Sequence, residues 1–147
     1  MRYIRKLFRW LKYNKRKKMY LEALFYAAIY RFLILIFSST FLEKRMGVRG
    51  EESEREIAKE AVNKGREIGY VVNWVCKRTP WESKCLVRAL TAQRMLRKRR
   101  ISSTLYLGCG KMDGKLVAHA WIRSGSQFLT GGNGDEYTMV AKFCRAE

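Results

Sequence analysis

The chain has few of the residues on which disulfide frameworks and metal sites depend. Its four cysteines, Cys76, Cys85, Cys109 and Cys144, form no CxxC pair and no regular framework, so we expect free thiols rather than the disulfides of small secreted domains. The only histidine is His119, and the cysteines and this histidine lack the short ligand spacings of structural zinc sites. We therefore expect neither a metal ion nor a cofactor.

Acidic residues are also scarce, with 13 Asp and Glu against 31 Lys and Arg and a formal net charge of +18. Such an excess predicts a surface field that attracts anions, such as acidic peptides, acidic proteins or anionic lipids. No nucleic-acid-binding module accompanies the charge, so we expect no nucleic acid partner. No cleavable secretion signal is evident either, because the apolar stretch begins only near Met19 and no small-residue cleavage site closes it. The cytoplasm is the simplest location.

The first 42 residues predict two unusual helices. Residues 1–18 hold nine Lys and Arg and no acid, with apolar residues at helical spacing, which is typical of a helix that lies on an anionic membrane, docks an acidic partner or packs on its own domain. Residues 19–42 are apolar over the length of about 20 residues that crosses a bilayer. Glu22 and Arg31 interrupt this span, and a charge at the bilayer centre costs roughly 3 kcal/mol. We expect a helix covered by protein or a peripheral contact at the inner face of the membrane.

The rest of the sequence predicts an α+β core. We divide the chain into a basic, apolar helical region, 1–50, and a core, 51–147. The run SERE at 53–56 has the pattern of a capping box that begins a helix, and Pro80 ends that helix. After a second helix that ends near Arg100, alternation predicts strands. They are expected at 103–110, 115–123, 127–131 and 137–143, with tight turns at 113–114 and 124–125.

Two residues of this core could carry chemistry. Cys85 falls in the first turn of the second helix, with Ser83 as its cap, where unpaired amides and the helix dipole favour a thiolate. Alternation in the strand 115–123 puts His119 between Ala118 and Ala120, and such small neighbours would let the helix start approach. His119 could then serve Cys85 as a base. Alternatively, Cys85 is a small buried apolar residue and His119 a satisfied polar group.

Three motifs give the chain a family resemblance: WESKCLVRAL at 81–90, LYLG at 105–108 and AHAWI at 118–122. With the apolar, basic region 30–47, they resemble the transglutaminase-like leader peptidases of lasso peptide biosynthesis. The resemblance implies a papain-like core in which a helix bearing the cysteine packs on an antiparallel sheet carrying the histidine. It implies Cys85 as nucleophile and His119 as base in the removal of a leader peptide from a ribosomally made precursor.

The resemblance also implies partners and a third catalytic residue. Family members act with a separate leader-binding protein, and an ATP-dependent cyclase then closes a macrolactam. The third residue of the family is an aspartate about twelve positions after the histidine, where it orients the imidazole. Gly131 stands at that place here. We expect the nearest acid, Asp135, to take the role, with Thr130, Asn133 or a backbone carbonyl as alternatives.

Two other functions fit the same residues. The Cys85 and His119 pair could pass an acyl group to an amine instead of water, which would make the chain an acyltransferase. The chain could also be a basic docking subunit that brings a biosynthetic complex to a membrane or an acidic partner, with Cys85 only structural.

Overall fold

The computed structural model describes residues 1–146, apart from the side chain of Leu7, and shows an α+β fold. The helices of this part of the chain are α1 (Arg2–Tyr13), α2 (Lys17–Ile36), α3 (Ser39–Met46), α4 (Lys59–Cys76) and α5 (Cys85–Lys98). The strands are β1 (Val48–Arg49), β2 (Ser103–Met112), β3 (Lys115–Ser124), β4 (Gln127–Thr130) and β5 (Thr138–Arg145). They form one antiparallel sheet in the order β1-β5-β2-β3-β4. The expected fold class is confirmed.

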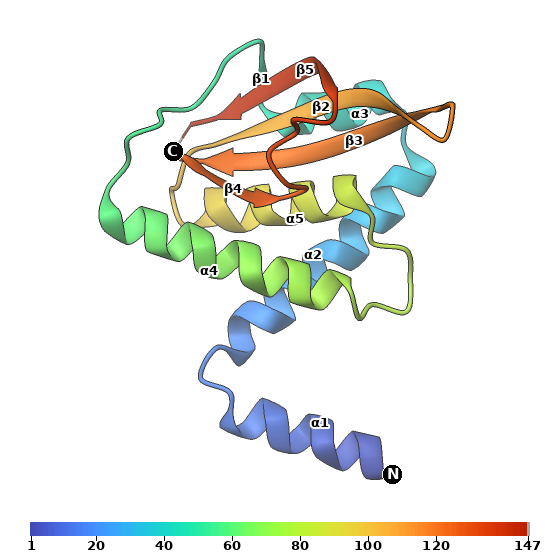
Figure 1. Cartoon of the computed structure of the whole chain (residues 1–147). Coiled ribbons are helices and arrows are strands. Elements are labelled where there is room, and N and C mark those ends of the chain that lie inside the picture. The colour runs from blue at the N-terminus through green and yellow to red at the C-terminus, as the bar shows by residue number, and fades with distance from the viewer. Residues whose placement is uncertain (147) are drawn as a thin grey trace.

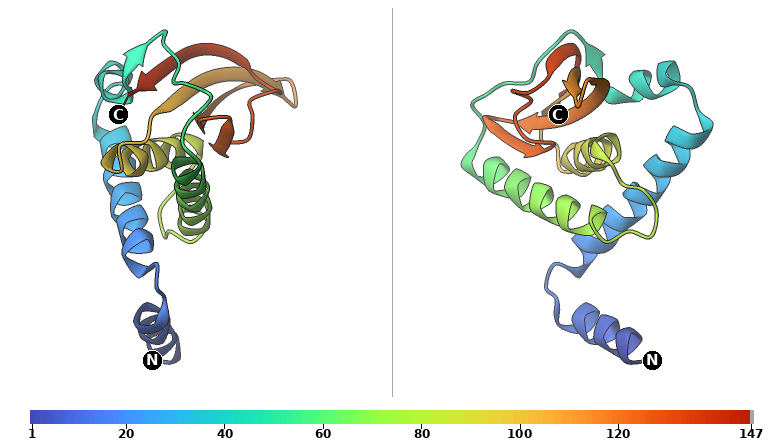
Figure 2. Two further views of the ribbon diagram at one scale, coloured as in Figure 1. Left: turned by 90° about the vertical axis from the view of Figure 1, so that its left-hand side faces the viewer. Right: turned by 45° about the vertical axis from the view of Figure 1, so that its right-hand side comes forward.

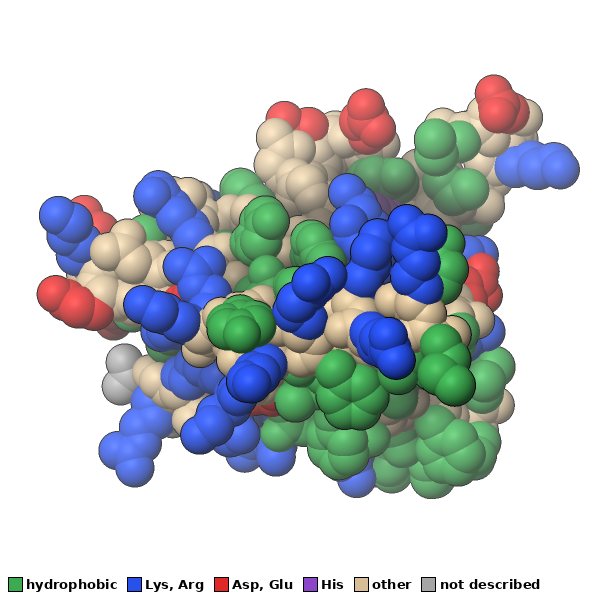
Figure 3. Space-filling view, turned by 90° about the horizontal axis from the view of Figure 1, so that it is seen from below, with side chains coloured by type: hydrophobic (Ala, Val, Ile, Leu, Met, Phe, Trp, Pro, Cys, Tyr) green, Lys and Arg blue, Asp and Glu red, His purple; other side chains and the backbone are tan. Residues whose placement is uncertain are grey.

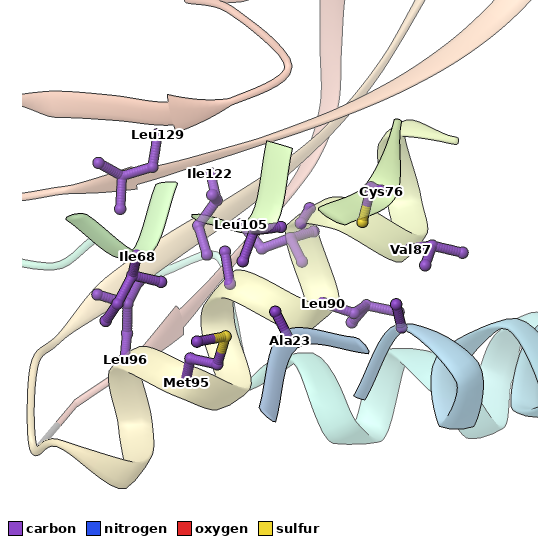
Figure 4. Close-up of a cluster of buried hydrophobic side chains, with 14 of the residues drawn as sticks. Ala23, Ile68, Cys76, Val87, Leu90, Met95, Leu96, Leu105, Ile122 and Leu129 are labelled. Carbon is purple, nitrogen blue, oxygen red and sulfur yellow. The ribbon is translucent and has the colours of Figure 1, made fainter. Parts of the chain in front are cut away.

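The molecule is layered, with the sheet above α4 and α5, and α2 packed against the far side of these helices (Figures 1 and 2). α1 projects from this body near the N-terminus. Apolar side chains from α4, α5, β2 and β3 meet between the layers (Figure 4). Leu90, Leu105 and Ile122 are each at most 2% exposed there. Burial of one such side chain stabilises the fold by about 1.5–3 kcal/mol, so this layer positions the helix start of α5 against the sheet.

The two regions predicted from the sequence share this core. Ala23 and Ala27 of α2 are fully buried in it, and β1 pairs with β5, with Val48 opposite Cys144. α1 docks through Trp10, whose ring stacks on Trp74 of α4 at a centroid distance of 5.6 Å. The division of the chain at residue 50 stays a prediction. In the structure, residues on the two sides of this boundary pack together.

The capping box predicted at 53–56 is wrong. α4 begins only at Lys59, and its N-cap Ala58 offers no side-chain hydrogen bond. Ser53 is buried instead, and its amide donates to Thr104 Oγ1 of β2 over 2.8 Å. The local pattern predicts that Ser53 caps the start of the helix. Ser53 bonds instead to Thr104, a residue far along the chain.

A buried arginine holds this segment on the sheet. Arg123 of β3 is 0% exposed. Its guanidinium donates to Tyr106 Oη at 2.9 Å, to the carbonyl of Ser53 at 3.0 Å and to the carboxylate of Glu52 at 3.3 Å. The face of the sheet away from α5 is therefore partly covered by the chain before α4.

The strands β2 and β3 are joined by the expected turn, with φ of 51° at Asp113 and 75° at Gly114.

Candidate functional site

Cys85 is the first residue of α5 and is half-buried. The N-cap residue Lys84 makes no side-chain cap hydrogen bond, and the first intrahelical bond runs from the amide of Arg88 to the carbonyl of Lys84 at 3.1 Å. The amides of the first turn therefore point out of the helix beside the thiol, where they favour negative charge. The predicted cap is wrong, because Ser83 is buried and its hydroxyl pairs with Thr79 Oγ1 at 2.7 Å.

His119 lies in the middle of β3, with one ring nitrogen engaged. Its Nε2 lies 2.7 Å from the carbonyl oxygen of Gly131. A carbonyl oxygen can only accept a hydrogen bond, so Nε2 carries the proton. In the neutral imidazole Nδ1 then holds the lone pair and is the nitrogen that can act as a base. The main chain thus fixes the tautomer of the only histidine.

An aromatic cluster holds the imidazole. The ring of His119 stacks on Tyr137 at a centroid distance of 4.3 Å and lies 5.9 Å from Trp121. Trp121 is 4% exposed, and Gly108 and Gly134 stand where a Cβ would overlap its indole. Tyr137 was not predicted as a site residue, because only the pairing of β5 with β2 brings the start of the last strand beside the histidine. No local pattern signals such a contact.

Cys85 and His119 come from elements that pack together, but their side chains are not paired. α5 contacts β3, and the face of β3 toward α5 carries Ala120 and Ile122, which belong to the core. His119 alternates with them and shares the other face with Trp121. Among residues 1–146 no hydrogen bond joins His119 to Cys85. Both side chains are half-buried, so each is open to solvent.

Among residues 1–146 no hydrogen bond joins Asp135 to His119. Asp135 sits exposed in the turn between β4 and β5, where its carboxylate accepts from Asn133 Nδ2 at 2.7 Å. Its own amide donates to Asn133 Oδ1 at 3.2 Å, so this pair forms a closed turn. Thr130 is buried, and within the described part of the chain its hydroxyl has no partner. Of the groups considered for the third role, the backbone carbonyl of Gly131 is the one that contacts the imidazole.

Two of the other cysteines, Cys76 and Cys144, are less suited to act as nucleophiles. Burial raises the pKa of the Cys76 thiol and that of the Cys144 thiol, which suppresses their thiolate forms. Cys109 is half-buried on β2. Within residues 1–146 no group of three or more His, Cys, Asp or Glu side chains is placed to hold a metal ion.

Comparison with known proteins identifies a family. Residues 27–142 match a family model described as the transglutaminase-like superfamily. The match runs from the second half of α2 into β5 and includes Cys85, His119 and Gly131. No curated protein and no solved structure matches the chain significantly.

Proposed function

This chain belongs to the transglutaminase-like superfamily, and we propose that it is a cysteine peptidase. Its substrate would be the precursor of a lasso peptide, from which it removes the leader. The observation that carries the proposal is the placement of two groups. Cys85 begins a helix whose first amides are uncapped, and that helix packs on the strand that bears a histidine protonated at Nε2.

The reaction would begin at the thiol. His119 Nδ1 takes the proton of Cys85, and the sulfur attacks the scissile carbonyl carbon. The amides at the start of α5 stabilise the oxyanion. The C–N bond then breaks as the proton passes from Nδ1 to the leaving amine, which leaves a thioester. Water, activated by His119, hydrolyses that thioester and restores the thiol. These steps consume one water and need no metal or nucleotide.

Catalysis requires a closer approach of the two side chains. A proton passes directly only when donor and acceptor lie within about 3.2 Å, and such contacts often tighten once substrate is bound. His119 lies on the face of β3 that points away from α5, so bringing the two side chains together would require a rearrangement of β3 or of the start of α5 when substrate binds. In the present arrangement Tyr137 and the carbonyl of Gly131 hold the ring.

The proposal includes partners. A separate protein would bind the leader, and an ATP-dependent cyclase would act on the freed amine. The net charge of +18 favours acidic segments of leader or partner. The basic surface would then hold the precursor near the site while the partner supplies specificity.

The test is leader removal by purified Cys85→Ala, with Cys109→Ala as the matched control because Cys109 is the other half-buried cysteine. Precursor and leader-binding protein are supplied to each variant, and products are followed by mass spectrometry. We expect Cys85→Ala to lose at least about a thousandfold in rate, and Cys109→Ala to retain the wild-type rate. Full trimming by Cys85→Ala would refute Cys85 as the nucleophile.

Product mass separates hydrolysis from acyl transfer, the second function that the superfamily supports. Hydrolysis yields two fragments whose summed mass exceeds that of the precursor by one water. Acyl transfer joins one fragment to an amine and releases the other. A joined product that depends on Cys85 would keep the nucleophile and replace the peptidase by an acyltransferase.

A further inference from the structure

The outer face of α2 is a continuous exposed apolar surface. Leu21, Phe25, Phe32 and Leu35 recur at the spacing of one helix face, and Phe32 and Leu35 are 60% and 66% exposed. We call this set, with Leu24 and Ile36, the α2 apolar face. Seen from below, hydrophobic side chains gather in one broad area with Lys and Arg side chains beside them (Figure 3). A surface of this kind marks a docking site for a protein or a membrane.

α2 is held to the body of the protein and lies flat on it. By length and composition it could cross a bilayer. However, Glu22 pairs with Arg99 of α5 at 2.8 Å, and Arg31 pairs with Glu82 before α5 at 3.2 Å. The opposite stripe of the helix is buried in the core. Spanning would break both ion pairs and expose that stripe, so only the outer face is available.

A pocket rich in arginine borders this face. Four guanidinium groups, those of Arg45, Arg94, Arg97 and Arg145, line a cavity of about 240 Å³ together with Tyr26 and Tyr30 of α2. Within residues 1–146 no carboxylate lies at ion-pair distance from these four arginines. Burial, followed by the charges of Arg97 and Arg94, lowers the pKa of Arg145. An anion in the cavity would relieve this repulsion.

We propose that the α2 apolar face docks on an anionic lipid bilayer, with a lipid phosphate in the arginine pocket. The helix would lie in the interface with its apolar side chains among the acyl chains, as amphipathic membrane-surface helices do. The arginines at its border, and the basic residues of α1, would lie at the level of the headgroups. The inference does not depend on the peptidase, and its test uses no precursor.

Charge favours a bilayer over a second copy of the chain. In a symmetric dimer the same surface meets itself, so two arginine pockets and two basic N-terminal helices would be brought together. The repulsion between two chains of charge +18 opposes such a contact. An anionic bilayer offers an apolar interior to the α2 apolar face and negatively charged headgroups to the arginine pocket.

The test is co-sedimentation of the full chain with vesicles of phosphatidylcholine, with or without phosphatidylglycerol. One variant combines Phe32→Ser with Leu35→Ser on the α2 apolar face. Its control combines Leu116→Ser with Val140→Ser, which are 74% and 61% exposed on the sheet. A second variant combines Arg94→Gln with Arg97→Gln. Its control combines Lys111→Gln with Lys115→Gln, both exposed in the β2–β3 hairpin.

We expect the wild type to bind vesicles that contain phosphatidylglycerol, and to bind less as salt rises. The apolar variant should lose about tenfold in affinity for each side chain, and the arginine variant about fivefold for each charge, while both controls bind as the wild type. Wild-type affinity in the apolar variant would overturn the proposal. So would binding that ignores lipid charge. A dimer by sedimentation velocity that only the apolar variant disrupts, without vesicle binding, would assign the face to self-association.

Discussion

At the scale of single residues, a main-chain carbonyl is the group that bonds the imidazole of His119. The leader peptidases that the sequence resembles carry an aspartate where this chain has Gly131, and the carbonyl of Gly131 accepts the hydrogen bond from His119 Nε2 at 2.7 Å. Gly131 has a φ of 77°, and a Cβ there would overlap the backbone oxygen of Ala120. An aspartate would therefore not fit this conformation. The backbone conformation at Gly131 thus explains why no aspartate stands there.

Gly131→Ala should damage both the fold and the site. The new methyl group would displace the backbone whose carbonyl holds His119, and we expect a loss of about 1–3 kcal/mol in the free energy of unfolding. Leader removal should fall more than tenfold because the tautomer is no longer fixed. Gly132→Ala is the control, since Gly132 has a similar φ of 73° with open space around it. Thermal unfolding and turnover measure the two effects, and equal turnover in both variants would contradict the role of the carbonyl.

Asp135→Asn should leave turnover close to the wild-type value. Asp135 pairs with Asn133 in an exposed turn, so its charge is screened from the imidazole by solvent. His119→Asn, measured in parallel, should lose activity as severely as the nucleophile variant. A tenfold or greater defect in Asp135→Asn would show that the turn folds back on the histidine when substrate binds.

Residues with local signals could be predicted from the sequence, and residues placed by long-range pairing could not. The sequence predicts Cys85 at a helix start because the break before it and the apolar spacing after it are adjacent in the chain. It predicts His119 on a strand from the alternation of its neighbours. Tyr137 and the carbonyl of Gly131 reach the imidazole through strand pairing and a turn of glycines. Neither contact leaves a pattern in the sequence.

At the scale of elements, the strands and hairpin turn were predictable and one helix start was not. Alternation over 103–123 extends across two full strands, and the turn between them carries Asp113 and Gly114. The capping box failed because a serine can bond any nearby amide or hydroxyl, and Ser53 bonds Thr104. A four-residue pattern carries no information about such a competitor.

The contact between α2 and α5 should depend on pH through Glu22. Burial alone would raise the pKa of Glu22, but the hydrogen bond and charge of Arg99, with Lys98, lower it below the ordinary 4.5. A depressed pKa stabilises the fold above the unfolded-state value, and this contribution disappears as pH falls through the folded-state value. Glu22→Gln should cost about 1–2 kcal/mol near neutral pH. The difference from the wild type should vanish in acid.

Urea unfolding of Glu22→Gln at several pH values measures this difference. Glu43→Gln serves as the control, because Glu43 pairs with Arg49 on the surface and should change stability less. If the difference in the free energy of unfolding between the wild type and Glu22→Gln persists unchanged below pH 4, the ion pair is not its cause.

Arg123→Met should be among the most destabilising substitutions in the sheet. It removes the bonds to Tyr106, Ser53 and Glu52. The buried hydroxyl of Tyr106 and carbonyl of Ser53 lose this donor, at a cost of about 3 kcal/mol. The exposed neighbour Arg55, which lies 4.0 Å from Glu52, provides Arg55→Met as the control. Chemical denaturation compares them, and similar midpoints would refute the structural role of Arg123.

At the scale of the whole molecule, the net charge of +18 should raise the rate at which the protein encounters an acidic precursor. Added salt should lower kcat/KM for an acidic precursor and leave kcat nearly unchanged, because screening weakens encounter more than chemistry. Replacing acidic residues of the leader by their amides should flatten this salt dependence. Stopped assays across a salt series measure both, and a kcat that falls with kcat/KM would point to an effect at the site itself.

The oxygen that orients His119 belongs to a peptide bond, so it escapes the usual genetic search for catalytic groups. An alanine scan through all 13 acidic residues would find no partner for the imidazole. The chain would then look like a two-residue enzyme or an inactive relative. Detecting this contributor requires chemistry that edits the backbone, such as replacing the peptide bond after Gly131 by an ester or a thioamide in a semisynthetic protein.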